Sequence, residues 1–250
     1  MKGLMLHKGA ELVSRDQLEN VPTPAATTTH QPVSHAGLVK LVERGLAYEN
    51  LNIVESSFGV TPDGNRLFGL MRLESENSEF GNIVGVRNSH DKKFPAGLCI
   101  GSKVFVCDNL AFSGQINVTR KHCPKIMQKL PGMVWEATAR MGLEFDSQAK
   151  RIRAYKEVEL SPMQTNDILV NLAENDSVVW RDIPKILKTY RGETHPEHRG
   201  NSMFSLWNAV TENAKGQPLE TLCRRTQGLH ATLDRIGGIN VEDSPVITVD

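Results

Sequence analysis

The apolar pattern of this sequence changes its period near the middle of the chain, and that change limits the folds that the chain can adopt. Between residues 51 and 119, apolar and polar residues alternate in short runs, which is typical of strands in an antiparallel sheet. From residue 122 onward, apolar residues recur at helical spacing. We therefore predict an α+β fold, in which an N-terminal helix and an antiparallel β-sheet are followed by a mainly helical C-terminal half.

Caps, prolines and turn residues set the boundaries of the predicted elements. Ser34 is a good N-cap for a helix over 35–48, and Pro62-Asp63-Gly64-Asn65 predicts a turn between strands over 52–60 and 67–73. Further strands are predicted over residues 82–87, 103–107 and 114–119. Further helices are predicted over residues 122–142 (with a late start or a kink because of Pro124 and Pro131), 147–158, 162–174, 180–190, 203–214 and 218–235.

These elements divide the chain into four parts. Residues 1–33 form a predicted N-terminal extension and linker, because residues 21–29 contain two prolines and little apolar periodicity surrounds them. An α+β core domain is predicted over 34–160, a helical region over 161–236 and a loosely held acidic tail over 237–250.

The composition is that of an ordinary globular protein. The 250 residues are 39% hydrophobic and 23% charged, so the chain can bury a core without a metal or a disulfide. The four cysteines include no Cys-x-x-Cys pair, which favours free thiols in a reducing compartment. No apolar run reaches the length of a membrane span or a signal peptide, and we expect a cytoplasmic protein without a membrane partner.

The formal net charge is zero, with 29 basic and 29 acidic residues, which removes the simplest argument for nucleic-acid binding. The charges are nevertheless segregated, with basic patches at 120–129 and 150–156 and acidic residues at 74–79 and 243–250. The simpler interpretation of each basic patch is a solvated helix face, and the alternative is a surface that contacts phosphate groups.

Two apolar runs end abruptly in polar clusters, Asn88-Ser89-His90-Asp91 and Cys107-Asp108-Asn109. Strand ends followed by polar side chains are common places for functional sites. Such side chains also cap turns and strand ends by bonding to the backbone, which is the simplest interpretation of these residues. The alternative is contact with a ligand or a nucleic acid.

Two enzymatic interpretations of the clusters are weaker. His90, Cys107, His122 and Cys123 are residue types that bind zinc, but their spacing contains no suitable ligand pair. Cys107 could act as a nucleophile with His90 or His122 as its base and Asp91 or Asp108 as the orienting group, yet nothing nearby marks Cys107 as activated.

Common catalytic motifs are missing from the sequence. It contains no Gly-x-Gly-x-x-Gly or Gly-x-x-x-x-Gly-Lys-Ser/Thr loop, which argues against nucleotide-driven chemistry. It also contains no His-Glu-x-x-His and no Gly-x-Ser-x-Gly, so the usual hydrolase signatures are absent. We predict no cofactor and no metal, and favour a binding protein over an enzyme.

Four motifs in the same order resemble the phage- and plasmid-borne proteins grouped as domain of unknown function 932. They are Val86–Asp91, Val106–Phe112, Arg120-Lys121-His122 and Leu206–Glu212, within a likeness that spans about residues 33–215. The resemblance implies a mobile element in a bacterial cytoplasm and supplies no catalytic residue. The order of elements is also similar to the core of phage single-strand annealing proteins such as Red-beta, RecT and Erf, which is an analogy of topology.

Our first hypothesis is a mobile-element protein that binds single-stranded or nascent duplex DNA, with single-stranded DNA favoured, through the DNA backbone and promotes strand annealing or recombination. The residues predicted to contact nucleic acid are Asn88, His90, Lys92, Lys93, Arg120, Lys121, Lys125, Arg151 and Arg153. We expect a homo-oligomer, because one small basic surface offers few phosphate contacts. The alternatives are an anti-defence or accessory protein that binds a host protein or a nucleotide, and an enzyme centred on His90, Cys107 and His122.

Overall fold

The computed structural model of the chain describes residues 9–75, 80–104, 109–192, 200–215, 217 and 219–241. Its first half contains β1 (Glu11–Val13), α2 (Arg15–Glu19), α3 (His35–Tyr48), β2 (Ile53–Val60), β3 (Arg66–Leu73), β4 (Phe80–Ser89), β5 (Ala96–Val104) and β6 (Asn109–Arg120). Its second half contains α4 (Ile126–Glu157), α5 (Pro162–Glu174), the 3₁₀ turn η1 (Trp180–Asp182), α6 (Ile183–Tyr190), α7 (Met203–Asn213) and α8 (Leu219–Gly237). The α+β fold class, with the sheet in the N-terminal half and helices after it, is confirmed.

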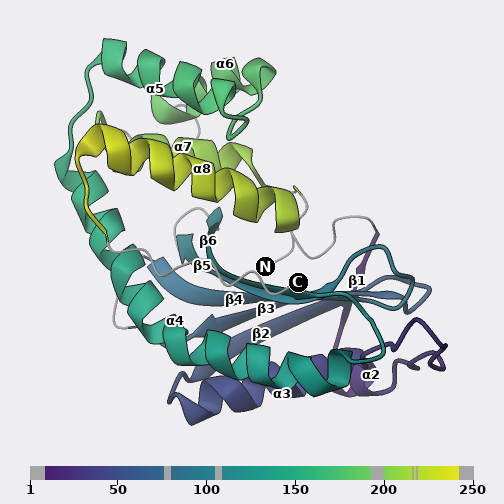
Figure 1. The fold of residues 1–250 in the computed structure, drawn as a ribbon. Coiled ribbons are helices and arrows are strands. Elements are labelled where there is room, and N and C mark those ends of the chain that lie inside the picture. The colour runs from purple at the N-terminus through teal and green to yellow at the C-terminus, as the bar shows by residue number, and fades with distance from the viewer. Residues whose placement is uncertain are drawn as a thin grey trace.

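The sheet lies between two layers of helices. Its strands pair antiparallel in chain order from β1 to β6. Helix α3 and the first part of α4 lie on one side of the sheet, α7 and α8 lie on the other, and α5 and α6 stack beyond them (Figure 1). One hydrophobic cluster fills the sheet layer and a second fills the helical half, and α4 contributes to both.

The turn between β2 and β3 forms where Pro62-Asp63-Gly64-Asn65 predicts it. The Asp63 carboxylate accepts hydrogen bonds from the Thr61 hydroxyl at 2.5 Å and from the Asn65 backbone N–H at 3.1 Å. Gly64 has a φ of +69°, a conformation that glycine adopts without steric cost. The turn fixes the register of the hairpin, in which Val60 pairs with Leu67.

Helix α3 begins after the predicted cap and crosses α4 closely. The Ser34 hydroxyl accepts a hydrogen bond from the Gly37 N–H at 3.2 Å. A Cβ added to Gly45 would lie 2.8 Å from Oγ1 of Thr138 on α4, so glycine allows the two helices to approach at this point. The crossing holds both helices against the same face of the sheet.

Helix α4 is longer than the sequence predicts. Its late start after Pro124 is confirmed, but the predicted break between residues 142 and 147 is wrong. Met141, Phe145 and Ile152 are all buried, so one apolar face continues through the expected break. The helix therefore links the two hydrophobic clusters.

The fourth predicted strand is misplaced. The sequence predicts it over 103–107, whereas β5 spans Ala96–Val104, and residues 105–108 lie outside the described residues. Leu98, Cys99 and Ile100 are consecutive buried residues, because helices cover both faces of this strand. Such a strand lacks the alternation on which the prediction depends.

Part of the predicted N-terminal extension belongs to the folded sheet. Leu12 of β1 pairs with Gly59 of β2, and the short helix α2 buries Leu18 completely. Residues 21–33 have no regular secondary structure, as the sequence predicts, yet Val33 at their end is buried. Most of the predicted acidic tail, residues 242–250, lies outside the described residues.

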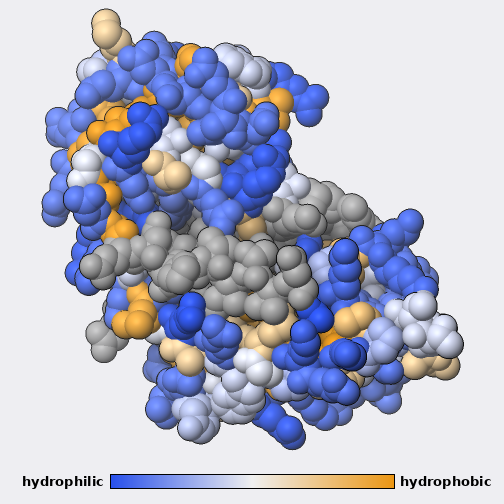
Figure 2. Space-filling model, viewed as in Figure 1, coloured by the Kyte–Doolittle hydropathy of each residue, from blue (hydrophilic) through white to orange (hydrophobic). Residues whose placement is uncertain are grey.

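Hydrophilic side chains cover most of the face seen in Figure 2, and the hydrophobic ones lie there in small separate groups. Among the residues that the structure describes, no helix is both long and apolar enough to cross a lipid bilayer.

Candidate functional site

Three strand ends meet at one end of the sheet. β4 ends at Ser89, β5 begins at Ala96, and β6 ends at Arg120, which pairs with Ala96. Because the strands are antiparallel, the β4–β5 turn lies beside the residues that follow β6. Residues 30–33 cross the same sheet end, where the Gln31 N–H donates to the His122 carbonyl at 2.9 Å.

The β4–β5 turn is held by the polar residues that the sequence singles out. The Asp91 carboxylate accepts from Arg66 Nη2 at 2.6 Å, from the Ser89 hydroxyl at 2.5 Å and from the Lys93 N–H at 3.2 Å. Burial raises the pKa of Asp91, but hydrogen bonds from Arg66 and Ser89 outweigh it and lower the pKa overall. The capping interpretation therefore describes Ser89 and Asp91 correctly.

Two exposed lysines project from this turn. Lys92 has a φ of 62°, a left-handed conformation that costs a non-glycine residue about 1 kcal/mol. Lys93 follows it, with its N–H also bonded to the Ser89 hydroxyl at 3.1 Å. The turn thus holds two neighbouring ammonium groups at a defined place on the sheet end.

Behind the turn lies a group of buried polar rings, His30, His35, His90 and His122, which with Asn88 we call the histidine cluster. The Val33 carbonyl accepts from Asn88 Nδ2 at 2.7 Å and from His90 Nε2 at 2.9 Å. The Val33 N–H donates to His122 Nδ1 at 3.3 Å. The rings of His35 and His90 stack with their centroids 3.9 Å apart, and the ring centroids of His30 and His122 lie 5.4 Å apart.

Backbone partners fix the tautomers of two of these rings. His35 Nε2 lies 3.1 Å from the Gly64 carbonyl and His90 Nε2 faces the Val33 carbonyl, so both Nε2 atoms carry the proton. His122 Nδ1 lies 3.3 Å from the Val33 N–H, and a backbone hydrogen bond with Gln31 raises the pKa of His122 against the effect of burial.

Burial keeps three rings of the cluster, those of His35, His90 and His122, neutral near pH 7. Burial, together with repulsion from His90, lowers the pKa of His35 from 6.5 to about 3. Burial, together with repulsion from His30 and His90, lowers the pKa of His122 from 6.5 to about 4. Burial also lowers the pKa of His90. These three rings therefore add hydrogen-bonding groups to the sheet end without adding charge.

A pocket of about 460 Å³ opens beside the histidine cluster, and we call it the lysine pocket. Within the described part of the chain, its lining contains three lysines and no acidic residue, and none of the three lysines forms an ion pair. The lining residues are Thr29, His30, Lys92, Lys93, Phe94, Pro95, Lys121, His122 and Cys123. Unpaired cations around a hollow attract anions.

Cys123 is a partly exposed thiol in this lining. Burial raises its pKa, but hydrogen bonding to Lys125 and the nearby Arg120 guanidinium, 3.8 Å from its sulfur, outweigh this and lower the pKa overall. Such a thiol reacts with alkylating reagents faster than buried Cys99 and Cys223 do. Cys123 therefore provides a chemical probe of the pocket.

The structure brings together five of the nine predicted contact residues on or near the pocket. Lys92, Lys93 and Lys121 line it, Arg120 adjoins it through Cys123, and exposed Lys125 follows two residues later. The sequence does not predict a role for His30, because its approach to His122 depends on the path of residues 30–33.

The other four predicted contacts lie elsewhere or are buried. Asn88 and His90 are buried in the histidine cluster, so neither lines an open groove as the sequence suggests. Arg151 is 1% exposed and its Nε donates to the Asp234 carboxylate at 2.8 Å, so we leave it out of the interface. Arg153 is exposed on α4, far along that helix from the pocket, and Cys107 lies outside the described residues.

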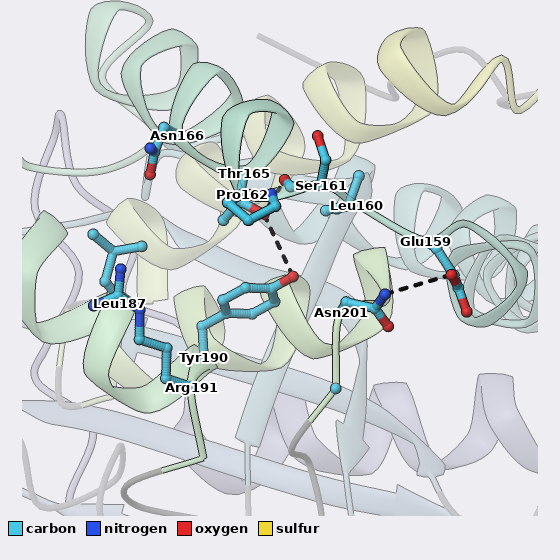
Figure 3. Close-up of a pocket in the computed structure, with 11 residues that line it drawn as sticks. Glu159, Leu160, Ser161, Pro162, Thr165, Asn166, Leu187, Tyr190, Arg191 and Asn201 are labelled. Atoms are coloured by element: carbon cyan, nitrogen blue, oxygen red, sulfur yellow. Dashed lines mark hydrogen bonds between the residues drawn. The ribbon is translucent and has the colours of Figure 1, made fainter.

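A larger pocket of about 860 Å³ lies in the helical half (Figure 3), and we call it the helical pocket. Thr165 Oγ1 lies 3.4 Å from the Tyr190 hydroxyl, and Asn201 Nδ2 donates to the Glu159 carboxylate at 3.4 Å. Its charged lining residues in the described chain are Glu159 and Arg191, one of each sign. Two pairs of polar side chains in its lining thus lie within hydrogen-bonding distance of each other.

Among the described residues, no group of three or more His, Cys, Asp or Glu side chains has the geometry to hold a metal ion. His90 and His122, which the zinc interpretation pairs, both belong to the histidine cluster instead.

Comparison of the chain with protein-family models, with curated proteins and with solved structures found no match. The resemblances to domain of unknown function 932 and to the annealing proteins therefore stay predictions.

Proposed function

We propose that this protein binds single-stranded DNA through backbone phosphates at the lysine pocket. The observation that carries the proposal is the set of three lysines, Lys92, Lys93 and Lys121, around a pocket whose described lining has no carboxylate. Phosphate groups are the natural counterions for such a lining, since nucleic-acid affinity comes mainly from phosphate neutralisation.

A single strand suits the pocket better than a duplex. Phe94 lines the pocket next to the lysines and is partly exposed, so an unstacked base can lie against its ring. A pocket of about 460 Å³ admits one nucleotide, whereas a duplex needs a broad surface. The turn that carries Lys92 and Lys93 is already rigid, which reduces the entropy lost on binding.

The first experiment measures the affinity for a fluorescently labelled oligothymidylate by anisotropy at about 50 and 200 mM salt. Replacing all three pocket lysines, Lys92→Ala, Lys93→Ala and Lys121→Ala, should weaken binding about 10- to 100-fold at low salt. The slope of log affinity against log salt should become shallower by about 2, because three lysine contacts to phosphate on a single strand are lost.

A matched triple variant removes the same charge from the helical half. Its three exposed lysines lie away from the lysine pocket, and its affinity should stay within about twofold of the wild type. The substitutions are Lys150→Ala, Lys185→Ala and Lys188→Ala. Equal losses in the two triple variants, or no binding by the wild type even at low salt, would show that the proposal is wrong.

Self-association belongs to the same proposal. One lysine pocket contacts only a few phosphates, and a ring or filament of copies repeats the contact along a strand. Light scattering after size exclusion, with and without a long oligothymidylate, measures this directly. We expect a larger assembly with the strand, and an RNA oligonucleotide of the same length tests the preference for DNA.

A further inference from the structure

Two aromatic side chains lie exposed and in contact on the helices that cover one face of the sheet. Tyr48, the last residue of α3, is 72% exposed, and Trp135 of α4 is 37% exposed. Their ring centroids lie 5.0 Å apart, with the ring planes at 90°. Tryptophan is highly buried on average, so an exposed Trp–Tyr pair marks a surface that can receive a ligand.

The packing of the two helices holds this aromatic pair in place. α3 and the first part of α4 lie side by side on the same face of the sheet (Figure 1), and they approach closely where Gly45 meets Thr138. Each of these two residues is three positions from one of the rings. In a T-shaped pair the edge of one ring meets the face of the other, which is a favourable arrangement. The rings are thus ordered before a ligand arrives, which reduces the entropy lost on binding.

The first turns of α4 carry cations on the same exposed face as Trp135. At about 100° per residue, four exposed residues fall within about 120° of the helix circumference. They are Lys125, Lys129, Gly132 and Trp135. A rise of about 1.5 Å per residue places Trp135 about 15 Å along the helix from Lys125. Because Lys121 lines the lysine pocket, these cations lead from the pocket to the aromatic pair.

The stretch of chain that carries these lysines contains no acidic residue. Between Asp108 and Glu136 the sequence has four lysines or arginines and no aspartate or glutamate. Of the acidic residues next to the two rings, Glu136 pairs with Arg140 at 3.1 Å, and Glu49 is half-buried. A ligand that spans the lysines and the rings therefore needs negative charges along its length and flat apolar groups beside them. A single strand of nucleic acid has this chemistry, because every nucleotide carries a phosphate and a base with a π-face.

Gly132 leaves the helix surface open between the lysines and Trp135. Glycine inside a helix is less favourable than alanine, so its presence there has a cost. A Cβ added to Gly132 would meet no atom of the described residues within 4 Å, so packing does not require glycine. Without a side chain at this position, a ligand can approach the helix backbone beside the Trp135 ring.

We propose that Tyr48 and Trp135 form a base-stacking platform for the same strand whose phosphates contact the lysine pocket. Between the two contact regions, the strand runs along Lys125 and Lys129. The inference rests on the proposed function and deepens it, since it names a second contact region and the path of the strand between the two.

The first test measures anisotropy with a labelled oligothymidylate of about 12 nucleotides, a length in the range that single-strand-binding domains cover. Trp135→Ala should weaken binding about 5- to 20-fold, because one base loses its stacking surface. Trp180 of η1 is 56% exposed in the helical half and provides a matched control. The affinity of Trp180→Ala should stay within about twofold of the wild type.

Two further substitutions at position 135 separate stacking from apolar packing. Trp135→Phe keeps a flat π-face, and its affinity should stay within about threefold of the wild type. Trp135→Leu keeps apolar bulk without a π-face and should lose nearly as much affinity as Trp135→Ala. Affinity that leucine restores as well as phenylalanine does would show that the ring does not stack on a base.

Tryptophan fluorescence reports the contact directly. A base that stacks on an indole quenches its emission, so oligothymidylate should quench the emission of the wild-type protein. Trp180→Phe should keep this quenching, and Trp135→Phe should lose it. The triple variant of the pocket lysines should need more oligothymidylate for the same quenching, because one strand makes both contacts.

A glycine substitution tests the path of the strand without removing an aromatic ring. Gly132→Gln places a side chain beside Trp135 and should weaken binding about threefold or more, although glutamine favours the helix. Gly142→Gln is the matched control, since Gly142 is also exposed on α4 and has no atom of the described residues within 4 Å of an added Cβ. Its affinity should not change.

The remaining outcomes are also decisive. Equal affinities of Trp135→Ala and Trp180→Ala, with binding that still depends on the pocket lysines, would overturn the platform and leave the proposed function standing. No binding by the wild type even at low salt would overturn both. If light scattering shows that Trp135→Ala dissociates an assembly that forms without DNA, the rings belong to an interface between copies of the chain, and the platform is wrong.

Discussion

The two pockets differ in what their polar groups are bonded to. In the helical pocket, Thr165 lies within hydrogen-bonding distance of Tyr190, and Asn201 bonds to Glu159. In the lysine pocket, the described residues leave three ammonium groups without ion pairs. The helical pocket is the larger of the two, about 860 Å³ against about 460 Å³. Its lining is also the one in which polar side chains lie within hydrogen-bonding distance of each other.

The difference teaches that volume alone does not identify a site. A hollow between packed helices forms whenever side chains fill the space incompletely, and it needs no ligand if its polar groups bond to one another. Like charges without ion pairs repel one another and weaken the folded state slightly. An anionic ligand between them would remove this repulsion. If this difference is real, substitutions in the helical half should change stability without changing oligonucleotide affinity, and substitutions around the lysine pocket should change the affinity.

The largest expected effect is on stability and comes from the helical half. Asp234→Asn removes the carboxylate to which buried Arg151 donates at 2.8 Å and weakens the bond from the Tyr155 hydroxyl, which is 2.6 Å long. The free energy of unfolding should fall by about 3 kcal/mol, since breaking one buried ion pair is strongly destabilising. Urea denaturation measures this, and oligothymidylate affinity under conditions where the variant is folded should not change. A loss of affinity in the folded variant would contradict the separation of the two regions.

Acid should destabilise the protein through the histidine cluster. The folded state holds His35 and His122 neutral, with pKa values of about 3 and about 4 against an ordinary 6.5. The unfolded chain therefore binds more protons below pH 6.5, so stability that is fully present above 6.5 is lost as the pH falls. The free energies of unfolding from urea denaturation at about pH 7.5 and about pH 5 should differ by roughly 4 kcal/mol for these two rings together.

Two features make the acid experiment specific. Hydrogen bonds from Thr61 and Asn65 lower the pKa of Asp63. At Asp91, burial raises the pKa, but hydrogen bonds from Arg66 and Ser89 outweigh it and lower the pKa overall. Both carboxylates therefore stay ionised at about pH 5. His230 in the helical half is buried and its pKa is also lowered, so it adds a loss of the same sign. His122→Asn should reduce the pH dependence of the free energy of unfolding by about 2 kcal/mol, and an unchanged dependence would show that His122 is not held neutral by the fold.

An aromatic substitution in each pocket compares their roles in binding. Phe94→Ala should weaken oligothymidylate binding about 3- to 10-fold, because the loss of one base-stacking surface costs about 1 kcal/mol or somewhat more. Tyr190→Ala in the helical pocket should leave the affinity unchanged. Thermal unfolding of both variants should be recorded alongside, since Phe94 also contacts Phe68 with ring centroids 5.4 Å apart. Equal effects on affinity would remove Phe94 from the interface.

The smallest expected effect tests the strain of the β4–β5 turn. Lys92→Gly relieves a left-handed conformation and should raise the free energy of unfolding by up to about 0.5 kcal/mol, after the entropic cost of glycine is subtracted. Lys93→Gly removes the same charge where φ is not positive and should lower stability by about 0.5 kcal/mol. Both should weaken oligonucleotide binding. If Lys92→Gly raises the free energy of unfolding, Lys93→Gly lowers it, and both variants bind the oligonucleotide more weakly, then the turn keeps a strained lysine for its charge.

Local signals were enough for much of the fold. Ser34 and Ser161 each cap a helix at the predicted residue, and Gly64 lies in the predicted turn. Such signals depend on neighbours in the sequence, so they are visible without the tertiary structure. β5 was misplaced because burial on both faces removes its alternation, and the continuity of α4 depends on packing at Phe145 and Ile152.

The candidate site was only partly accessible to sequence reasoning. Lys92, Lys93 and Lys121 stood out as cations beside predicted strand ends, and the structure places all three around one pocket. Arg151 stood out as a member of the basic patch at 150–156 but is buried against Asp234, which is 83 residues away in the chain. Charge is visible in a sequence, whereas whether a partner neutralises it depends on distant residues.

By itself, the sequence determined the kinds of element, their order and the turn residues that join them, because these follow from interactions between residues close together in the chain. Only the tertiary structure decided that Val33 bonds to Asn88 and His90 at the end of β4 and to His122 after β6, two segments distant from Val33 in the chain. Strand register and the path of residues 30–33 bring these groups together, and both are set by packing between segments far apart in the chain.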